Sequence, residues 1–114
     1  MSRITTHVLD TARGRPADGV PICLEIERVP AQWTRLGQGA TDADGRLRTL
    51  MPSDLALVYA SYRLVFDTGA YFEAQSCEVF FPHVVITFVV HDPTQHFHVP
   101  LLLSPFGYST YRGS

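Results

Sequence analysis

Two histidines near the end of the chain have the types and spacing for acid–base chemistry. His96 and His98 lie two residues apart in the extended run HFHVPLLL, so alternation along a strand points both imidazoles to one face. The chain then ends on the tail YRGS at 111–114, which supplies a phenol, a guanidinium, a hydroxyl and the α-carboxylate. If the tail is held in place, these groups and the imidazoles can transfer protons on a small polar substrate.

His7 and Arg46 carry groups that suit the same chemistry, although each has an ordinary explanation when it is taken alone. His7 lies on the opposite strand face from Ile4 and Val8, where a histidine is more often structural than catalytic. Arg46 follows a turn, where an arginine is usually a solvated cation, and it forms a close pair with Arg48. A local basic pocket for an anionic ligand therefore stays open.

The sequence gives little support for a bound metal. Two histidines with this spacing on a strand can both bind zinc, but a zinc site needs a third and a fourth ligand. Neither Cys23 nor Cys77 lies at a spacing from His96 and His98 that would indicate a zinc site, and no acidic residue does. We therefore expect no metal and no other cofactor.

Composition limits the class of protein. The chain has 114 residues, of which 46% are hydrophobic and 18% charged, and this suits a single domain over residues 1–114. The net charge of -2 lacks the basic excess that nucleic-acid or acidic-membrane binding needs. The polar first residues do not resemble a signal peptide, and no apolar run is long enough to span a bilayer. We expect a cytoplasmic protein that binds neither nucleic acid nor membranes.

The elements that must position these groups are mainly strands. Apolar and polar residues alternate in short segments that Gly, Pro and Asp separate. The expected strands are 4–9, 22–26, 33–41 (broken by Gly37 and Gly39), 46–50, 56–66, 84–91 and 97–103, with 10–19 as turn. The segment 42–45 predicts a hairpin turn, and Asp67 or Thr68 an N-cap of a short helix. About seven or eight short strands indicate an all-β fold, a β-sandwich.

Seven strings of residues along the chain resemble one known family. They are ITTHVLD at 4–10, GRPADGV at 14–20, TDADGR at 41–46, FDTGAY at 66–71, FFP at 80–82, HFHVPLLLSP at 96–105 and YRGS at 111–114. Together they resemble the 5-hydroxyisourate hydrolases, the enzymatic branch of the transthyretin-like family. The terminal YRGS is highly specific for this family, whereas Asp-Gly-Arg alone does not identify any family. Phe97 stands where the family more often has Tyr, and alternation points it away from the two histidines.

The resemblance implies a fold, an assembly and a reaction. The fold is a transthyretin-like β-sandwich of about eight strands in two sheets with one short helix, assembled as a homotetramer, a dimer of dimers. The reaction is hydrolysis of the small molecule 5-hydroxyisourate, the product of urate oxidation, to 2-oxo-4-hydroxy-4-carboxy-5-ureidoimidazoline. The implied catalytic residues are His7, Arg46, His98 and Ser114, and the implied substrate-binding residues are His7, Arg46, Tyr111, Arg112 and Gly113.

The implied ring opening needs a base for water, a cation for the developing oxyanion and an acid for the leaving nitrogen. Our hypothesis is that His98 and His7 share water activation and proton return, with the Ser114 hydroxyl as a candidate relay. Arg46 holds either the carbonyl oxygens of the substrate or the oxyanion, while Tyr111 and Arg112 position the substrate and the tail. The sequence leaves open which histidine is the base.

Two other classes of protein remain as alternatives. One is a non-catalytic, transthyretin-like binder of a small aromatic ligand, which shares the fold. Its apolar channel has little use for so many polar groups, so the set of candidate residues favours the enzyme. The other is a structural or metal-binding β-domain that uses His96 and His98.

Overall fold

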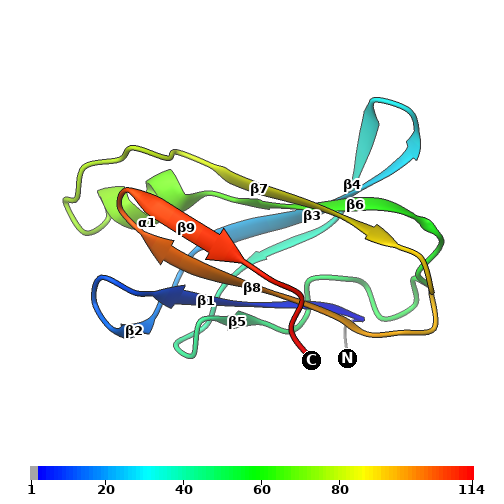
Figure 1. The fold of residues 1–114 in the computed structure, drawn as a ribbon, viewed down its shortest axis with the longest axis horizontal. Helices are drawn as coiled ribbons and strands as arrows, with labels where there is room; N and C mark the ends of the chain where they lie inside the picture. The colour runs from blue at the N-terminus through cyan, green and yellow to red at the C-terminus, as the bar shows by residue number, and fades with distance from the viewer. Residues whose placement is uncertain (1–2) are drawn as a thin grey trace.

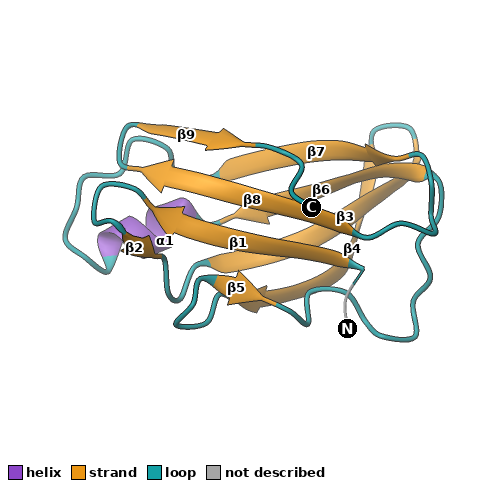
Figure 2. Ribbon diagram, turned by 60° about the horizontal axis from the view of Figure 1, so that its bottom comes forward, coloured by secondary structure: helices purple, strands orange, loops and turns teal. Residues whose placement is uncertain are grey.

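The computed structural model describes residues 3–114, which form two β-sheets packed face to face with one short helix at one end (Figures 1 and 2). One sheet has the strand order β2-β1-β8-β9, and β5 also pairs with β1. The strands of this sheet are β1 (Ile4–Asp10), β2 (Arg15–Pro16), β5 (Arg46–Leu47), β8 (Phe97–Ser104) and β9 (Gly107–Thr110). The other sheet has the order β4-β3-β6-β7, with β3 (Pro21–Val29), β4 (Gln32–Ala40), β6 (Ala60–Phe66) and β7 (Val84–Val90). The helix is α1 (Thr68–Glu73). The predicted all-β sandwich with one short helix is confirmed.

The core lies between the two sheets and is built from alternate residues of the longer strands. In β1 the burial alternates without interruption, so that Ile4 and Val8 are fully buried while Thr5 and His7 are half-buried on the outer face. In β8, Leu101 and Leu103 are fully buried in the same core. Each such side chain stabilises the fold by roughly 1.5–3 kcal/mol. The core therefore fixes which side chains the outer face presents.

Strand β1 runs parallel to β8 and antiparallel to β5, and these two pairings set the neighbours of its outer-face residues. Against β8, Thr5 lies opposite His98 and His7 opposite Pro100. Against β5, His7 lies opposite Arg46. Parallel neighbours need a long crossover connection, and here most of the chain lies between β1 and β8. Residues from both ends of the sequence thereby meet on one face of one sheet.

The C-terminal tail continues the pairing of β9 with β8. Leu101 pairs with Thr110 in the regular ladder. His98, three residues before Leu101, pairs with Gly113, three residues after Thr110, in an isolated bridge that keeps the same register. The ladder stops between them at Pro100, which has no N–H to donate. The carbonyl of Pro100 accepts the Thr110 hydroxyl at 2.7 Å instead. Pro100 thus ends β9 without detaching the tail.

Several strand boundaries differ from the predicted ones. The predicted strand 56–66 begins only at Ala60, because the Tyr62 hydroxyl bonds the backbone N–H and carbonyl of Val58 and folds this segment into a loop. The predicted strand 46–50 ends at Leu47. The two-residue strand β2, within the predicted turn 10–19, and strand β9 were not expected. Strand β4 is continuous, although its pairing with β3 shifts register near Gly37.

The helix and the turn follow the sequence pattern more closely. Asp67 is the N-cap of α1, and its side chain accepts the backbone N–H of Ala70 at 3.0 Å, as predicted. The buried carboxylate of Asp10, at the end of β1, accepts a hydrogen bond from the Tyr71 hydroxyl at 2.7 Å and so connects the helix to the sheet.

Among the described residues, no helix is long and apolar enough to cross a membrane.

Candidate active site

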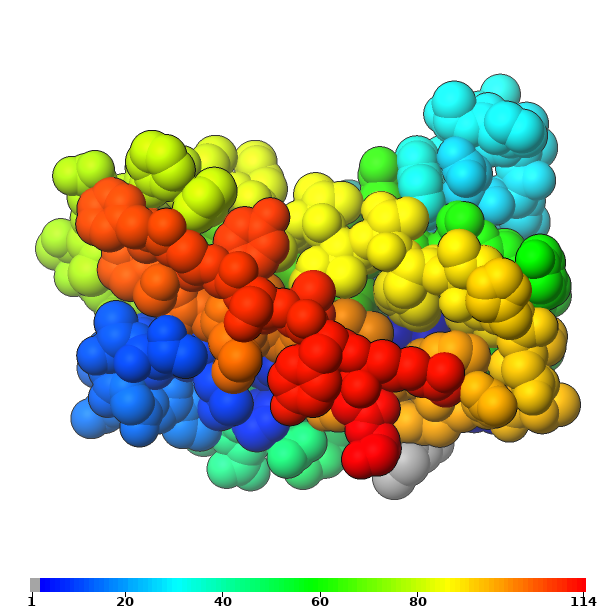
Figure 3. All heavy atoms as spheres, viewed as in Figure 1, coloured from blue at the N-terminus to red at the C-terminus, as the bar shows by residue number. Residues whose placement is uncertain are grey.

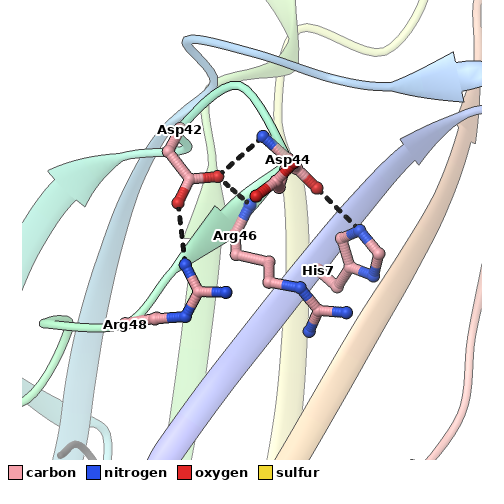
Figure 4. A network of polar contacts seen from close by, with 5 residues as sticks. All are labelled: His7, Asp42, Asp44, Arg46 and Arg48. Atoms are coloured by element: carbon pink, nitrogen blue, oxygen red, sulfur yellow. Dashed lines mark hydrogen bonds and ion pairs between the residues drawn. The ribbon is translucent and has the colours of Figure 1, made fainter.

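Arg46 leaves a turn that the carboxylate of Asp42 holds in one shape (Figure 4). Oδ1 of Asp42 accepts the backbone N–H of Asp44 at 2.9 Å and that of Arg46 at 3.0 Å, while Oδ2 lies 3.2 Å from Nη1 of Arg48. The backbone N–H of Arg46 contributes most to lowering the pKa of Asp42, followed by that of Asp44 and the charges of Arg48 and Arg46. The turn therefore fixes the backbone from which the Arg46 side chain extends.

Gly45 lets this turn approach β1 closely. Its φ of 76° lies in the left-handed region that favours glycine. A Cβ at this position would lie 2.3 Å from the carbonyl oxygen of Val8, and the carbonyl of Gly45 accepts the N–H of Val8 at 2.8 Å. The turn is thus attached to β1 at the residue that follows His7.

His7 lies beside Arg46, and its ring orientation is fixed by the turn. Nε2 of His7 is 2.8 Å from the backbone carbonyl oxygen of Asp44. A carbonyl only accepts hydrogen bonds, so Nε2 carries the hydrogen and the lone pair of neutral His7 is on Nδ1. Figure 4 shows the Arg46 side chain extending toward this ring. The guanidinium of Arg46 makes no hydrogen bond or ion pair with residues 3–114, which leaves its donors available to a ligand.

The ring of His98 is held on two edges. Nδ1 lies 2.8 Å from the hydroxyl oxygen of Thr5, the residue opposite it on β1. On the other edge the backbone of Gly113 is so close that an added Cβ would lie 2.6 Å from Cδ2 of His98. Nε2 has no hydrogen-bond partner in the described part of the chain. The only nitrogen of this ring that is free to act is therefore Nε2.

The surroundings of His98 favour the neutral form of its imidazole. Burial lowers the pKa of His98 below the ordinary value of 6.5, and the charge of Arg46 and repulsion from the imidazoles of His7 and His96 lower it further. A neutral imidazole at pH 7 can accept a proton from water. The electrostatics of the site thus favour His98 in the form that a general base requires.

The tail is anchored by three contacts and lies on the surface of the molecule (Figure 3). The N–H of Gly113 donates to the carbonyl of His98 at 2.8 Å. Nη2 of Arg112 donates to Oε1 of Gln95 at 2.8 Å, and its guanidinium lies 4.6 Å from the centre of the Phe97 ring. The absence of a Cβ at Gly113 is what allows the backbone to lie against the imidazole.

A cavity of about 230 Å³ joins most of these groups. It is lined by Thr5, Thr6, Arg46, Leu47, Arg48, His96, His98 and Ser114. The lining thus combines two imidazoles, two guanidinium groups and the terminal serine, which can bind an anionic or carbonyl-rich molecule and transfer protons on it. His7 lies next to Arg46 at the side of this cavity, outside its lining.

Two of the three tail residues that we predicted to bind substrate lie elsewhere. Tyr111 and Arg112 line a separate cavity of about 260 Å³ together with residues of β7 and the inner-face residues Phe97 and Val99. Within this single chain, Arg112 therefore anchors the tail, and Tyr111 is 57% exposed. The structure separates these two side chains from the histidines that the sequence grouped with them.

Two contacts of the histidines were not singled out from the sequence. Thr5 bonds His98 and lies 3.3 Å from Nε2 of His96, and the carbonyl of Asp44 holds His7. Alternation did place Thr5 on the same face as His7, so a signal for Thr5 was present.

In the described part of the chain, no three His, Cys, Asp or Glu side chains form a group that could hold a metal ion.

The fold and the site together define a class of small β-sandwich proteins with a polar site on the outer face of one sheet, to which Ser114 of the tail contributes. A model of the HIUase/Transthyretin family matches residues 4–113. The chain is 48% identical to the 5-hydroxyisourate hydrolase of Caulobacter vibrioides, with 100% of each chain covered.

Two solved structures share the fold. The 5-hydroxyisourate hydrolase of Klebsiella pneumoniae superposes with a TM-score of 0.84 and is 38% identical, with 100% of each chain covered. Sea bream transthyretin in complex with thyroxine superposes with a TM-score of 0.90 and is 30% identical, covering 98% of this chain and 95% of that one. The chain belongs to the HIUase/transthyretin family.

Proposed function

We propose that the chain is a 5-hydroxyisourate hydrolase of urate degradation, a hydrolase that opens a cyclic amide. The observation that carries this proposal is the convergence of His98, Arg46 and Ser114 on one cavity, with His7 directly beside Arg46. The full-length relative from Caulobacter vibrioides that carries this name supports the same activity. An apolar ligand channel has little need of such charged and titratable side chains.

In the proposed reaction, water attacks the ring carbonyl carbon next to N1 of the substrate. The unpartnered Nε2 of His98 removes a proton from this water as the new C–O bond forms, which leaves a negative charge on the carbonyl oxygen. The guanidinium of Arg46, free of other partners among residues 3–114, stabilises that charge through hydrogen bonds. The neutral state of His98 supports its role as the base.

The second step breaks the bond between this carbon and N1. The electron pair of the bond passes to N1, and the proton held on His98 is returned to N1, directly or through the Ser114 hydroxyl. The new carboxylic acid then releases its own proton to solvent, so the product carries a carboxylate and a ureido group, and His98 is neutral again. We assign the base to His98 rather than to His7, because only His98 lines the cavity together with Arg46 and Ser114. We assign to His7 a contact with the substrate beside Arg46, its neighbour across the two strands.

The proposal retains substrate contacts for the tail. Gly113 positions the terminal Ser114 in the cavity, and Ser114 offers its hydroxyl and carboxylate to the substrate or to water. Tyr111 and Arg112 contact substrate only in an assembly in which a neighbouring subunit places its own site next to them. Within one chain, their proposed role is to hold the tail in register.

A homotetramer, a dimer of dimers, is part of the proposal. Strands β7 and β9 are the last strands of their sheets, and residues of both segments line one cavity at the same side of the sandwich. Exposed apolar side chains lie on or near them, with Phe80 59%, Phe106 63% and Tyr108 44% exposed. Unpaired edge strands with apolar neighbours favour association with a second copy. Light scattering after gel filtration measures whether four chains associate.

A cytoplasmic location is also proposed. Cys23 and Cys77 are both unpaired, which agrees with a reducing compartment. Fractionation of the source cells, followed by immunodetection, tests this part of the proposal independently of the activity.

The activity is tested by following 5-hydroxyisourate, freshly generated from urate by urate oxidase, in the ultraviolet. The wild-type chain should accelerate its decay above the uncatalysed rate, and His98→Ala should lose roughly 10²–10⁴-fold of that acceleration. His91→Ala, which removes an exposed histidine outside the cavity, is the matched control and should keep full activity. Decay at the uncatalysed rate with the wild-type chain would exclude the hydrolase and leave the aromatic-ligand binder as the alternative.

A further inference from the structure

Thr5 occupies a special place between two imidazoles. Its hydroxyl oxygen lies 2.8 Å from Nδ1 of His98 and 3.3 Å from Nε2 of His96. The position follows from the fold, because the parallel pairing of β1 with β8 sets Thr5 directly opposite His98. Thr5 is half-buried on the face that forms the cavity and is itself part of the cavity wall.

The hydroxyl has a single hydrogen, so it can donate to only one of the two rings. If Thr5 donates to His96, then Nδ1 of His98 must carry a hydrogen and donate to Thr5. If Thr5 donates to His98, then Nε2 of His96 must carry the hydrogen. The short chain His98–Thr5–His96 therefore runs in one of two directions, and each direction fixes the tautomer of both neutral rings.

Only one direction leaves a usable base. A neutral imidazole with hydrogen on Nδ1 has its lone pair on Nε2, the ring atom of His98 that has no partner among residues 3–114. In the opposite direction Nε2 carries the hydrogen and cannot accept one from water. This step of the inference rests on the proposed function, because it takes His98 as the general base.

We propose that Thr5 is a positioning residue that selects the Nδ1–H tautomer of His98 by accepting its hydrogen and donating its own to Nε2 of His96. The tautomer of His7 needs no such residue, because a backbone carbonyl already determines it. Among residues 3–114, the two histidines of the site thus leave opposite nitrogens without a hydrogen-bond partner, Nδ1 in His7 and Nε2 in His98. The difference comes from the partner that each ring meets on the neighbouring strand or turn.

The test compares Thr5→Val, which keeps the shape of the side chain and removes the hydroxyl, with Thr5→Ser, which keeps the hydroxyl. Thr5→Val should lower kcat roughly ten- to a hundredfold, the loss typical when the partner of a functional histidine is removed. Because the variant does not remove a charged substrate contact, KM should change by less than about twofold. Thr5→Ser should restore most of the rate. Thr11→Val, which removes a hydroxyl bonded to Leu103 at 3.2 Å, is the control and should behave as wild type.

Nitrogen NMR of the imidazole rings gives a readout that does not depend on the activity. In the wild type, Nδ1 of His98 and Nδ1 of His96 should carry the hydrogen, with the His98 signals assigned by their loss in His98→Ala. In Thr5→Val the Nδ1–H population of His98 should fall. An Nε2–H form of His98 in the wild type, or an unchanged tautomer and rate in Thr5→Val, would overturn the inference. A wild type with this tautomer but no hydrolysis would instead refute the proposed function.

Discussion

The turn 42–46 and the tail 111–114 deliver groups to the same cavity, but they are held very differently. The turn is bonded internally by the Asp42 carboxylate and by the N–H of Gly45, which donates to the carbonyl of Asp42 at 2.9 Å. It is also attached to β1 through Val8. The tail has one backbone bond to β8, from Gly113, and the two contacts of Arg112.

The difference teaches that stability and function are coupled in the turn and separable in the tail. Gly45 is buried against β1, so a change there disturbs the sheet as well as Arg46. Most of the tail is exposed, so a change there alters the cavity and leaves the core between the sheets intact. Changes in the turn and in the tail, together with the pH dependence and the titration of His98, test or refine this comparison.

Gly45→Ala should have the largest effect, because it affects both folding and catalysis. The left-handed φ and a Cβ only 2.3 Å from the Val8 carbonyl oxygen both oppose a side chain. We expect the free energy of unfolding to fall by roughly 2–4 kcal/mol, together with most of the activity, as measured by urea unfolding and turnover.

The control for this variant is Gly14→Ala. Gly14 has a similar φ of 66°, but nothing lies within 4 Å of an added Cβ. It should lose only about 1 kcal/mol and keep its activity. Equal losses in the two variants would show that the close approach of the turn to β1 is unimportant.

Deletion of residues 111–114 should abolish most of the activity while the sandwich stays folded. The deletion removes Ser114 from the cavity and the contact of Gly113 with His98, and we expect kcat/KM to fall roughly 100-fold. The melting temperature should change little, because the deleted residues contribute no buried core side chain. A C-terminal extension should also lower activity by displacing the carboxylate. A large loss of melting temperature in the deletion variant would contradict the separation of function from stability.

Gly113→Ala is a smaller perturbation of the same region. The added Cβ would lie 2.6 Å from Cδ2 of His98, so either the tail or the imidazole must move. We expect kcat to fall about tenfold, as for a small misplacement of a reacting group. Gly107→Ala, where the nearest atom is the Ser104 hydroxyl oxygen at 3.7 Å, is the control and should be unaffected. Full activity in Gly113→Ala would mean that the tail does not need to contact the imidazole.

The pH dependence should show the smallest effect. Because the folded-state pKa of His98 is lowered, kcat/KM should stay high at pH 6.5 and fall only at lower pH. The unfolded chain binds this proton first, at about pH 6.5. His98 therefore reduces the free energy of unfolding as the pH falls from there to its folded-state pKa.

The source of the lowered pKa can be tested by proton NMR titration of His98. Burial is the largest cause, so Arg46→Gln should raise the pKa only part of the way back, by removing one of the positive charges that face the ring. The remaining groups near it are His7, His96 and the Ser114 carboxylate. Arg48→Gln, whose charge is paired with Asp42, should leave the pKa of His98 unchanged. An equal shift in both variants would show that Arg46 has no special position.

Much of the fold could be predicted because strand alternation, helix capping and turn chemistry are local. The predicted strands 4–9, 84–91 and 97–103 matched β1, β7 and β8 within one residue at the ends, and Asp67 capped the helix as predicted. The failures arose where distant contacts override local pattern. The Tyr62 hydroxyl converts 56–59 into a loop, and β9 forms only because β8 is available to pair with it.

The sequence by itself determined which side chains share a strand face, since successive residues alternate with a period of two whatever the neighbouring strand is. It placed Thr5 with His7 and His96 with His98, and its motifs indicated the family that the comparisons established. The tertiary structure alone decided that Thr5 meets His98, that His7 meets Arg46, and that Tyr111 and Arg112 line a different cavity. Strand order and register bring together residues far apart in the chain, and they depend on packing of the whole core rather than on any local segment.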